Sequence, residues 1–332
     1  MSWLNLTIRL RQHITELLDY ESRCQLRLCS KDDRETVDST RFIPSTFKIS
    51  EFPSDMSNGK TIIRIDIDTF TMWFIGKENL TRIDRGWNGE LIDGMSQIKQ
   101  ENRYELVNQF LQSWSHKGFI KCGSFELDVL EVPPPTTWKF KSNVIKIVNL
   151  SANYLEWIES CVPFNEFFKV MEILCWMDVA MTPVLSVLNV KKSLKVDQPL
   201  DLTDGQLERI HAPDLSISSA LISVEGAKKR LEHFLKFGNK TDKMELGFSV
   251  PPNFNALEQL IPKHLVVKKL KKENEQEGEF YGKIFGGFEN VNKVQDPREI
   301  DCMQYGNMIR LYCGLYEKST RPCMMYPFYQ FL

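Results

Sequence analysis

The sequence lacks the short motifs by which many enzymes and metal-binding proteins are identified. It has eight cysteines, but no two have the Cys-x-x-Cys spacing of zinc sites, and its five histidines are scattered. Gly238-Asn239-Lys240-Thr241 is no phosphate-binding loop, because the upstream glycine and the Gly-Lys-Thr order are missing. We therefore expect reduced, mostly buried cysteines, no metal, no cofactor and no catalytic activity.

The sequence also lacks a charge excess and a long uninterrupted apolar run. Its 42 basic and 44 acidic residues give a net charge of −2, which provides no general field for nucleic acid or membrane surfaces. Charged residues and Pro183 interrupt the most apolar stretch, 167–190, so we expect a buried helix and strand there and no membrane span. No signal peptide is apparent either. These absences predict a protein of the cytoplasm or the nucleus, without nucleic-acid or membrane partners.

A helical pattern occupies the first 40 residues. Its apolar residues recur at helical spacing, at Leu6, Leu10, Ile14, Leu17 and Leu18. Asp19 and Ser22 offer side-chain oxygens where a second helix would start, and Asp32 or Asp33 would cap a third. A segment of about 40 residues cannot bury enough apolar surface to be stable alone. Its apolar face should therefore pack on the rest of the chain or on a partner. An ordinary N-terminal helical hairpin is the alternative interpretation.

Several of these residues resemble a known family. Leu6, Ile14, Leu18-Asp19 and Leu26-Arg27-Leu28-Cys29-Ser30-Lys31 follow the register of the F-box. The local sequence is most similar to the nematode-expanded F-box protein family, in which the F-box precedes an FTH-type C-terminal domain. Weaker similarities to that family are found at residues 65–68, 87–94 and 151–157. The resemblance implies an F-box-like helical domain at 1–42 and an α/β substrate-recognition domain at 43–332.

The resemblance implies a substrate-recognition subunit of a cullin-based, SCF-type ubiquitin ligase. Its partners would be a Skp-family adaptor, through it a cullin, and an unknown protein substrate. The adaptor-binding residues would be Leu6, Ile14, Leu17, Leu18, Leu26 and Lys31. Thr7 replaces the usual proline, Arg9 an acidic residue and Asp33 an aromatic one, and each change is worth about 0.3–1 kcal/mol of docking. A protein-interaction module that no longer docks the adaptor is the alternative hypothesis.

In the body, strand-like runs alternate with short amphipathic helices, which predicts an α/β class with a mixed or parallel sheet. We interpret it as an irregular leucine-rich-repeat-like curved sheet, and a closed, non-repeating α/β domain is the rival. The expected strands are 61–68, 71–75, one within 119–132, 144–148, 194–196, 214–217 and 243–250. The expected helices are 104–114, one begun by Ser151, 204–210, one capped by Ser223, and 255–261. A hairpin turn is expected at 57–59, and loops at 87–94, 271–279 and 295–299.

Two features of the body resemble binding sites. Asp66 and Asp68 form an Asp-x-Asp pattern that some transferases use to hold a divalent metal. We expect both on one strand face, where a solvated role explains them more simply. Trp87 stands in a polar segment and is a weak candidate for a substrate-binding anchor. A zinc site from Cys302, Cys313 and Cys323 is not expected, because their spacing fits no known ligand pair.

Overall fold

The structure is a computed structural model with two compact units. The first unit comprises Met1–Gln198 with Ile210–Ala212, and the second comprises Pro199–Arg209 with Pro213–Leu332. The structure describes residues 3–53, 61–77, 79–92, 96–115, 118–128, 135, 137–148, 157–158, 168–174, 189–239, 241–251, 259–260, 280–285, 298–305 and 308–315. The N-terminal helices lie in the same unit as a large part of the sheet. The expected domain boundary after residue 42 stays a prediction.

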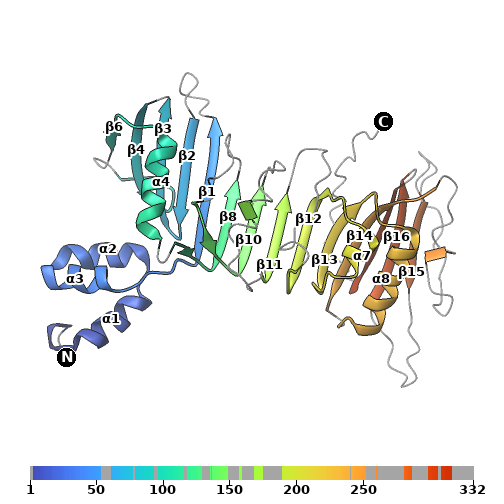
Figure 1. Ribbon diagram of the computed structural model, residues 1–332. Coiled ribbons are helices and arrows are strands. Elements are labelled where there is room, and N and C mark those ends of the chain that lie inside the picture. Colours follow the sequence, from blue (N-terminus) through green and yellow to red (C-terminus); the bar gives the residue numbers. More distant parts are fainter. Residues whose placement is uncertain are drawn as a thin grey trace. The chain divides into compact units, whose positions relative to one another are not determined.

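The N-terminal segment forms one short 3-10 helix and three α-helices (Figure 1). These are η1 (Trp3–Asn5), α1 (Ile8–Leu17), α2 (Tyr20–Cys29) and α3 (Lys31–Ser39). Thr7, Asp19 and Ser30 cap the three α-helices, each accepting a hydrogen bond from the backbone N–H three residues on. The prediction that Asp32 or Asp33 caps the third helix is wrong. The cap lies just before the first helical residue with an extended backbone, and Ser30 has that conformation, with φ −154° and ψ 170°.

The first unit contains a mixed sheet, as predicted. Its strand order is β12-β11-β10-β8-β1-β2-β3-β4-β5, with β6 also paired to β4. The bounds are β1 (Thr46–Pro53), β2 (Thr61–Ile67), β3 (Phe70–Lys77), β4 (Leu80–Trp87), β5 (Glu90–Leu91), β6 (Gln97–Lys99), β8 (Ser124–Asp128), β10 (Val144–Val148), β11 (Val170–Leu174) and β12 (Ser193–Pro199). Pairing is parallel from β12 to β1 and antiparallel from β1 to β5. β7 (Ile120–Lys121) and β9 (Phe140–Lys141) form a separate parallel pair.

The parallel strands share one register, so residues of like character lie side by side. One buried row comprises Phe47, Phe125, Ile145, Met171 and Leu194, and a second comprises Ile49, Leu127, Ile147, Ile173 and Val196. Between them, on the opposite face, runs a charged row made of Asp66, Lys48, Glu126, Lys146, Glu172 and Lys195. The sign of the charge alternates at every step, so each strand meets an opposite charge on its neighbour.

Helix α4 (Arg103–Trp114) packs against β3 and carries part of the core of the first unit (Figure 1). A buried ion pair fixes its first turn to the sheet. The Glu51 side chain is 2% exposed, and its carboxylate accepts hydrogen bonds from Arg103 at 3.0 and 3.3 Å and from the Tyr104 hydroxyl at 2.5 Å. Because α4 begins at Arg103, this network sets where the helix meets the sheet.

The second unit has a sheet in the order β13-β14-β17-β16-β15 and two described helices. Its elements are α7 (Asp204–Leu207), β13 (Asp214–Ser219), α8 (Val224–Phe237), β14 (Lys243–Ser249), β15 (Phe280–Phe285), β16 (Arg298–Tyr305) and β17 (Met308–Leu315). β13 and β14 are parallel, and the remaining pairs are antiparallel. Ser223 caps α8 as predicted, with its hydroxyl accepting a hydrogen bond from the Gly226 N–H at 3.0 Å.

The seven expected strands correspond to β2, β3, β8, β10, β12, β13 and β14, but strands such as β1, β4 and β11 were not predicted and two expected loops are wrong. Residues 87–94 contain a hairpin, in which Asn88 and Gly89 connect β4 to β5 with φ of 52° and 82°. An Asn-Gly pair tolerates two successive positive φ values and so favours a two-residue hairpin turn. The segment 295–299 overlaps β16, which begins at Arg298 and pairs with β17. The expected turn at 57–59 and loop at 271–279 lie outside the described residues, as do most of the helices expected from Ser151 and at 255–261. The leucine-rich-repeat-like character stays a prediction.

No helix among the described residues is long and apolar enough to cross a membrane. Two of the described cysteines, Cys122 and Cys313, are buried. Burial raises the pKa of the Cys122 thiol to about 12, so it stays protonated at neutral pH.

We predict that Glu51→Ala lowers the free energy of unfolding by about 3–5 kcal/mol, because it removes the buried carboxylate to which Arg103 and Tyr104 donate. Glu90→Ala, at an exposed position of the same sheet, is the matched control and should change it by less than about 0.5 kcal/mol. Urea unfolding of both variants measures the difference. A loss below about 1 kcal/mol for Glu51→Ala would show that the network contributes little.

Candidate adaptor-binding surface

The interior of the N-terminal helices is polar. Thr15, Arg23, Asp33 and Thr36 are each at most 5% exposed. The two threonine hydroxyls donate to the carbonyl four residues earlier in their helix, both at 2.8 Å. Buried polar groups are costly unless they are hydrogen-bonded, and these partners remove the cost. The helices therefore pack with polar contacts inside them.

Arg23 connects α2 to the chain that follows α3. Its Nε donates to the Leu18 carbonyl at 3.2 Å, and its Nη atoms donate to the carbonyls of Thr40 and Arg41 at 3.2 and 3.3 Å. Its guanidinium also lies 4.8 Å from the centre of the Phe42 ring. Burial lowers the pKa of this guanidinium, and the carbonyl dipoles stabilise its charge. Arg23 thus fixes the exit from the helices toward β1.

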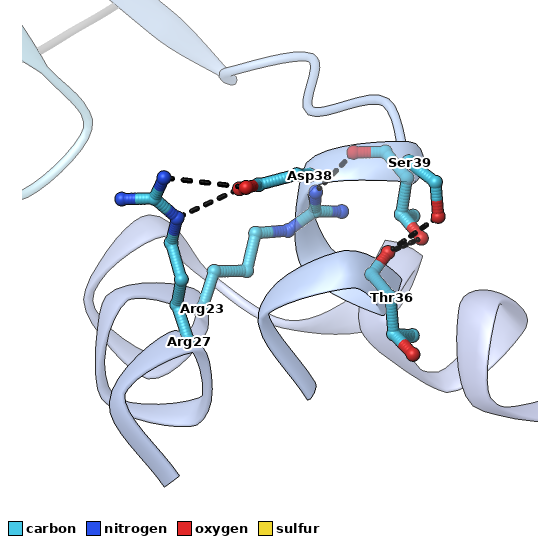
Figure 2. A network of polar contacts seen from close by, with 6 residues as sticks. Arg23, Arg27, Thr36, Asp38 and Ser39 are labelled. Carbon is cyan, nitrogen blue, oxygen red and sulfur yellow. Dashed lines mark hydrogen bonds and ion pairs between the residues drawn. The ribbon is translucent and has the colours of Figure 1, made fainter. Parts of the chain in front are cut away.

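Asp33 joins the start of the chain to α3. The Trp3 indole N–H donates to its Oδ1 at 2.6 Å, and the Ser30 hydroxyl donates to its Oδ2 at 2.6 Å. The hydrogen bond from Ser30, followed by that from Trp3, lowers the pKa of the Asp33 carboxyl below 3.8. On the outer side, Arg27 makes two hydrogen bonds with Asp38, at 2.7 and 3.2 Å (Figure 2). Both of these side chains are about half exposed, so the pair adds little stability.

The apolar residues of α1 face outward. Leu10, Ile14 and Leu17 lie at i, i+4 and i+7, which places them on one face of the helix. Leu10 is 44% and Leu17 is 75% exposed, whereas Thr15 is fully buried. On α2, Leu28 is also 75% exposed. An amphipathic helix normally buries its apolar stripe, so an outward stripe indicates a surface that a partner covers.

The six residues predicted to bind the adaptor divide into two groups. Leu17 and Lys31 are exposed, and the half-buried ones are Leu6, Ile14, Leu18 and Leu26. Among the described residues of these helices, the further exposed apolar side chains are Ile8, Leu10 and Leu28, which the prediction omitted. The helical spacing of Leu10 with Ile14 and Leu17 was a usable signal. Leu28 had none, because only the packing of α2 on α3 shows which side of α2 is covered.

An aromatic cluster attaches α2 to the sheet of the first unit. The Tyr20 ring lies 5.0–6.0 Å from four other rings, those of Phe42, Phe70, Trp87 and Trp114. We call these five residues the aromatic cluster. Tyr20 opens α2, while the other four come from the segment after α3, from β3, β4 and α4. Burial raises the pKa of the Tyr20 hydroxyl, so it stays neutral. Ring contacts of this kind add to the free energy of apolar burial.

Trp87, the weak candidate for substrate binding, belongs to this cluster. Its ring is half-buried and lies 4.9 Å from the Phe70 ring. The structure thus gives the side chain a packing role inside the first unit, and substrate binding by Trp87 stays a prediction.

The structure separates the two aspartates of the Asp-x-Asp pattern. Asp66 lies in β2 and accepts hydrogen bonds from Arg64 at 2.9 Å and Thr71 at 2.7 Å. Asp68 lies in the turn after β2, with φ of 53°, and accepts from the Thr46 N–H at 2.8 Å. The expectation that both lie on one strand face is wrong, because the strand ends at Ile67. Within the described part of the chain, no three His, Cys, Asp or Glu residues cluster as metal ligands would.

Comparison with known proteins identifies the N-terminal helices. The family model of the F-box domain matches residues 3–44. No curated protein and no solved structure matches the chain. The chain thus carries an F-box domain, and F-box domains in general bind a Skp-family adaptor and, through it, a cullin scaffold. This indicates a substrate-recognition role in an SCF-type ubiquitin ligase in general terms. The finer assignments, to the nematode-expanded family and to an FTH-type C-terminal domain, stay predictions.

We predict that acid weakens the N-terminal helices through Asp33. Its folded pKa lies below the ordinary 3.8, so its stabilising effect is present above that pH and is lost as the pH falls through the folded pKa. The free energy of unfolding, measured between about pH 5 and pH 3, should therefore fall less steeply for Asp33→Asn than for the unmodified protein. Asp32→Asn, at the exposed neighbouring position, is the control and should keep the steeper slope. Parallel slopes for the unmodified protein and Asp33→Asn would contradict the prediction.

We predict that Tyr20→Ala lowers the free energy of unfolding by about 3–5 kcal/mol, because it removes the centre of the aromatic cluster. Phe237→Ala is the control, since this ring of α8 is 64% exposed and should contribute less than about 0.5 kcal/mol. Chemical unfolding gives the energies, and limited proteolysis near residues 40–46 reports whether the helices detach. Equal effects of the two substitutions would refute an anchoring role for Tyr20.

Proposed function

We propose that this protein is a substrate-recognition subunit of a cullin-based, SCF-type ubiquitin ligase. Its F-box would bind a Skp-family adaptor, and the rest of the chain would bind a protein substrate. One observation carries the proposal: within the segment that the F-box model matches, the apolar stripe of α1 faces outward while the interior is polar. The protein itself would catalyse nothing and need no cofactor.

The docking surface we propose centres on Leu10 and Leu17 of α1 and Leu28 of α2. Each of these side chains is at least 44% exposed. Full burial of a leucine is worth about 1.5–3 kcal/mol relative to its exposed state, so a partner helix that covered these three would gain much of a specific affinity. The half-buried residues of the predicted set, Leu6, Ile14, Leu18 and Leu26, would pack beneath these three exposed side chains.

Two of the three departures from the F-box pattern have structural roles that support docking. Thr7 replaces proline but caps α1, with its Oγ1 accepting from the Leu10 N–H at 3.4 Å. Asp33 replaces an aromatic residue but is hydrogen-bonded to Trp3 and Ser30 inside the helices. Both residues thereby keep the helices in place. Arg9 is different, because it is exposed in the first turn of α1, where the helix dipole disfavours a positive charge.

For the substrate, we propose the polar face of the first unit's sheet, which carries the charged row. Four of its six side chains lie on β8 to β12 in steps of one strand. Lys195 is exposed and the other members are half-exposed, so a protein partner has access to charges of both signs. Mixed charges give specificity and correct orientation more than affinity. The aromatic cluster would hold this face at a fixed place relative to the F-box, so that the ligase meets the same side of each substrate.

The further assignments follow the same proposal. We propose membership of the nematode-expanded family, with an FTH-type, leucine-rich-repeat-like body, and a place in the cytoplasm or the nucleus. A module that no longer docks the adaptor is the second candidate, and the exposed positive charge of Arg9 favours it.

The decisive test is adaptor binding by Leu17→Asp/Leu28→Asp. Both side chains are 75% exposed, so the substitutions should leave the fold intact while placing two charges in the docking surface. We expect the affinity for a purified Skp-family adaptor to fall by about 100-fold or more. The matched control is Leu221→Asp/Phe237→Asp, whose side chains are 54% and 64% exposed in the second unit. Unchanged affinity of the first variant, or no binding by the unmodified protein, would favour the second candidate.

Substrate binding is tested by affinity purification with mass spectrometry. We expect proteins captured by both the unmodified chain and Leu17→Asp/Leu28→Asp to be substrates, and proteins lost with that variant to be ligase subunits. Lys146→Glu/Lys195→Glu, which reverses two charges of the charged row, should lose the substrates and keep the adaptor. Retention of every captured protein by this variant would exclude the charged row as the substrate surface.

A further inference from the structure

The second unit contains a cavity that the proposed function does not use. It lies between the end of α7 and the middle of α8, and its volume is about 320 Å³. Four described side chains line it: Glu208 after α7, and Lys229, Arg230 and His233 on α8. Since a water molecule occupies about 30 Å³ in the liquid, the cavity has room for roughly ten. It is therefore large enough for a small ionic group with its attached atoms.

Arg230 is the unusual residue of this cavity. It occurs on the buried face of α8, beside Ala227, Leu231 and Phe234, and is only 8% exposed. Its Nε atom is buried without a hydrogen-bond partner. Among the described residues, no carboxylate lies within ion-pair distance of its guanidinium, including Glu208 in the same cavity. Burial lowers the pKa of Arg230, which shows that its charge has lost water without gaining a counter-charge.

A buried guanidinium without a partner is costly, because few interactions replace its hydration. Arg23, in the first unit, shows the usual solution, since it donates to three carbonyls. Arg230 has no such acceptors among the described residues, yet it faces a cavity that also receives Lys229 and His233. An anion that enters the cavity would supply the missing partner.

The walls of the cavity are held in place independently of any ligand. Asp204, the first residue of α7, accepts from the Ser223 N–H at 2.9 Å and from the Ser223 hydroxyl at 2.6 Å. Gly226, in the first turn of α8, allows the Asp204 carboxylate to lie close to the α8 backbone, because a Cβ at this position would be only 2.0 Å from that carboxylate. The two helices are therefore clamped at one end, and the cavity forms at the other. Such preorganisation lowers the entropy lost on binding.

We propose that this cavity binds a phosphate monoester. A phosphoryl group brings up to two negative charges and three acceptor oxygens, which match the two cations at the cavity, the guanidinium fork of Arg230 and the ammonium of Lys229, with the His233 ring beside them. A carboxylate offers one charge and two oxygens, so it would leave one of these two cations unbalanced. The site would serve equally for a phosphorylated protein side chain or a small phosphorylated metabolite. Adaptor docking is not part of this inference.

The test is binding of phenyl phosphate to the full-length protein, followed by calorimetry, with inorganic phosphate and benzoate titrated in parallel. We expect phenyl phosphate to bind more tightly than benzoate. Arg230→Met should weaken the binding of phenyl phosphate by about tenfold or more and should keep or raise the melting temperature of the free protein, because it removes an unpaired buried charge. Lys236→Gln, on the exposed side of α8, is the matched control and should bind as the unmodified protein does.

Two further variants keep the proposal testable if Arg230→Met fails to fold. Lys229→Gln, at an exposed position, should weaken the binding of phenyl phosphate, and Glu208→Gln should strengthen it by removing the one acidic side chain among the described lining residues. A phosphoserine peptide that binds more tightly than phenyl phosphate would identify a phosphorylated protein as the source of the ligand. Equal affinities for phenyl phosphate and inorganic phosphate would instead indicate a small phosphorylated metabolite. Absence of phosphate binding, equal affinity for benzoate, or unchanged binding in Lys229→Gln and Glu208→Gln would overturn the proposal. None of these results depends on the adaptor, so they are distinct from a failure of the proposed function.

Discussion

The hydrogen-bonded polar interior of the N-terminal helices is the constraint on which the F-box surface depends. Arg23 and Asp33 are buried because backbone carbonyls, Ser30 and Trp3 satisfy them. On α1 the buried residue is Thr15, and with Thr15 inside, the helical period places Leu10 and Leu17 outside, where water is in contact with apolar surface. The helices cannot be stabilised by their own apolar core, so they need the aromatic cluster around Tyr20, and the exposed stripe is left available to a partner.

The sheet of the first unit reflects a second constraint, which is the common register of its parallel strands. Successive side chains of a strand point to opposite faces of the sheet. Because the two apolar rows are buried on one face, the charged row between them lies on the other. Alternating charge makes this register favourable, since a shift of two residues would separate Lys146 from Glu172 and Glu172 from Lys195. The same alternation keeps the face polar and accessible. The side chains of the charged row thus both stabilise the sheet and remain accessible to a partner.

Local patterns predicted much of this fold. The alternating run at 61–68 is β2 up to Ile67, and the cap at Ser223 begins α8. Both signals come from residues close in sequence. The predictions that were wrong involved competing local signals: the cap of α3 is Ser30 and not an aspartate, and Asn88-Gly89 makes a hairpin where a loop was expected. In the proposed docking surface, Leu17 was predicted and is exposed, whereas Leu28 was missed because its exposure depends on how α2 packs.

The sequence by itself determined the F-box register, the mixed α/β class and the positions of seven strands, because helical and strand periods are properties of neighbouring residues. Only the tertiary structure decided which faces are covered. It joined Tyr20 to rings from four other segments, and it buried Arg230 beside a cavity without a partner among the described residues. Contacts between distant segments leave no periodic trace in the chain, since they arise from burial and shape complementarity once the elements have packed.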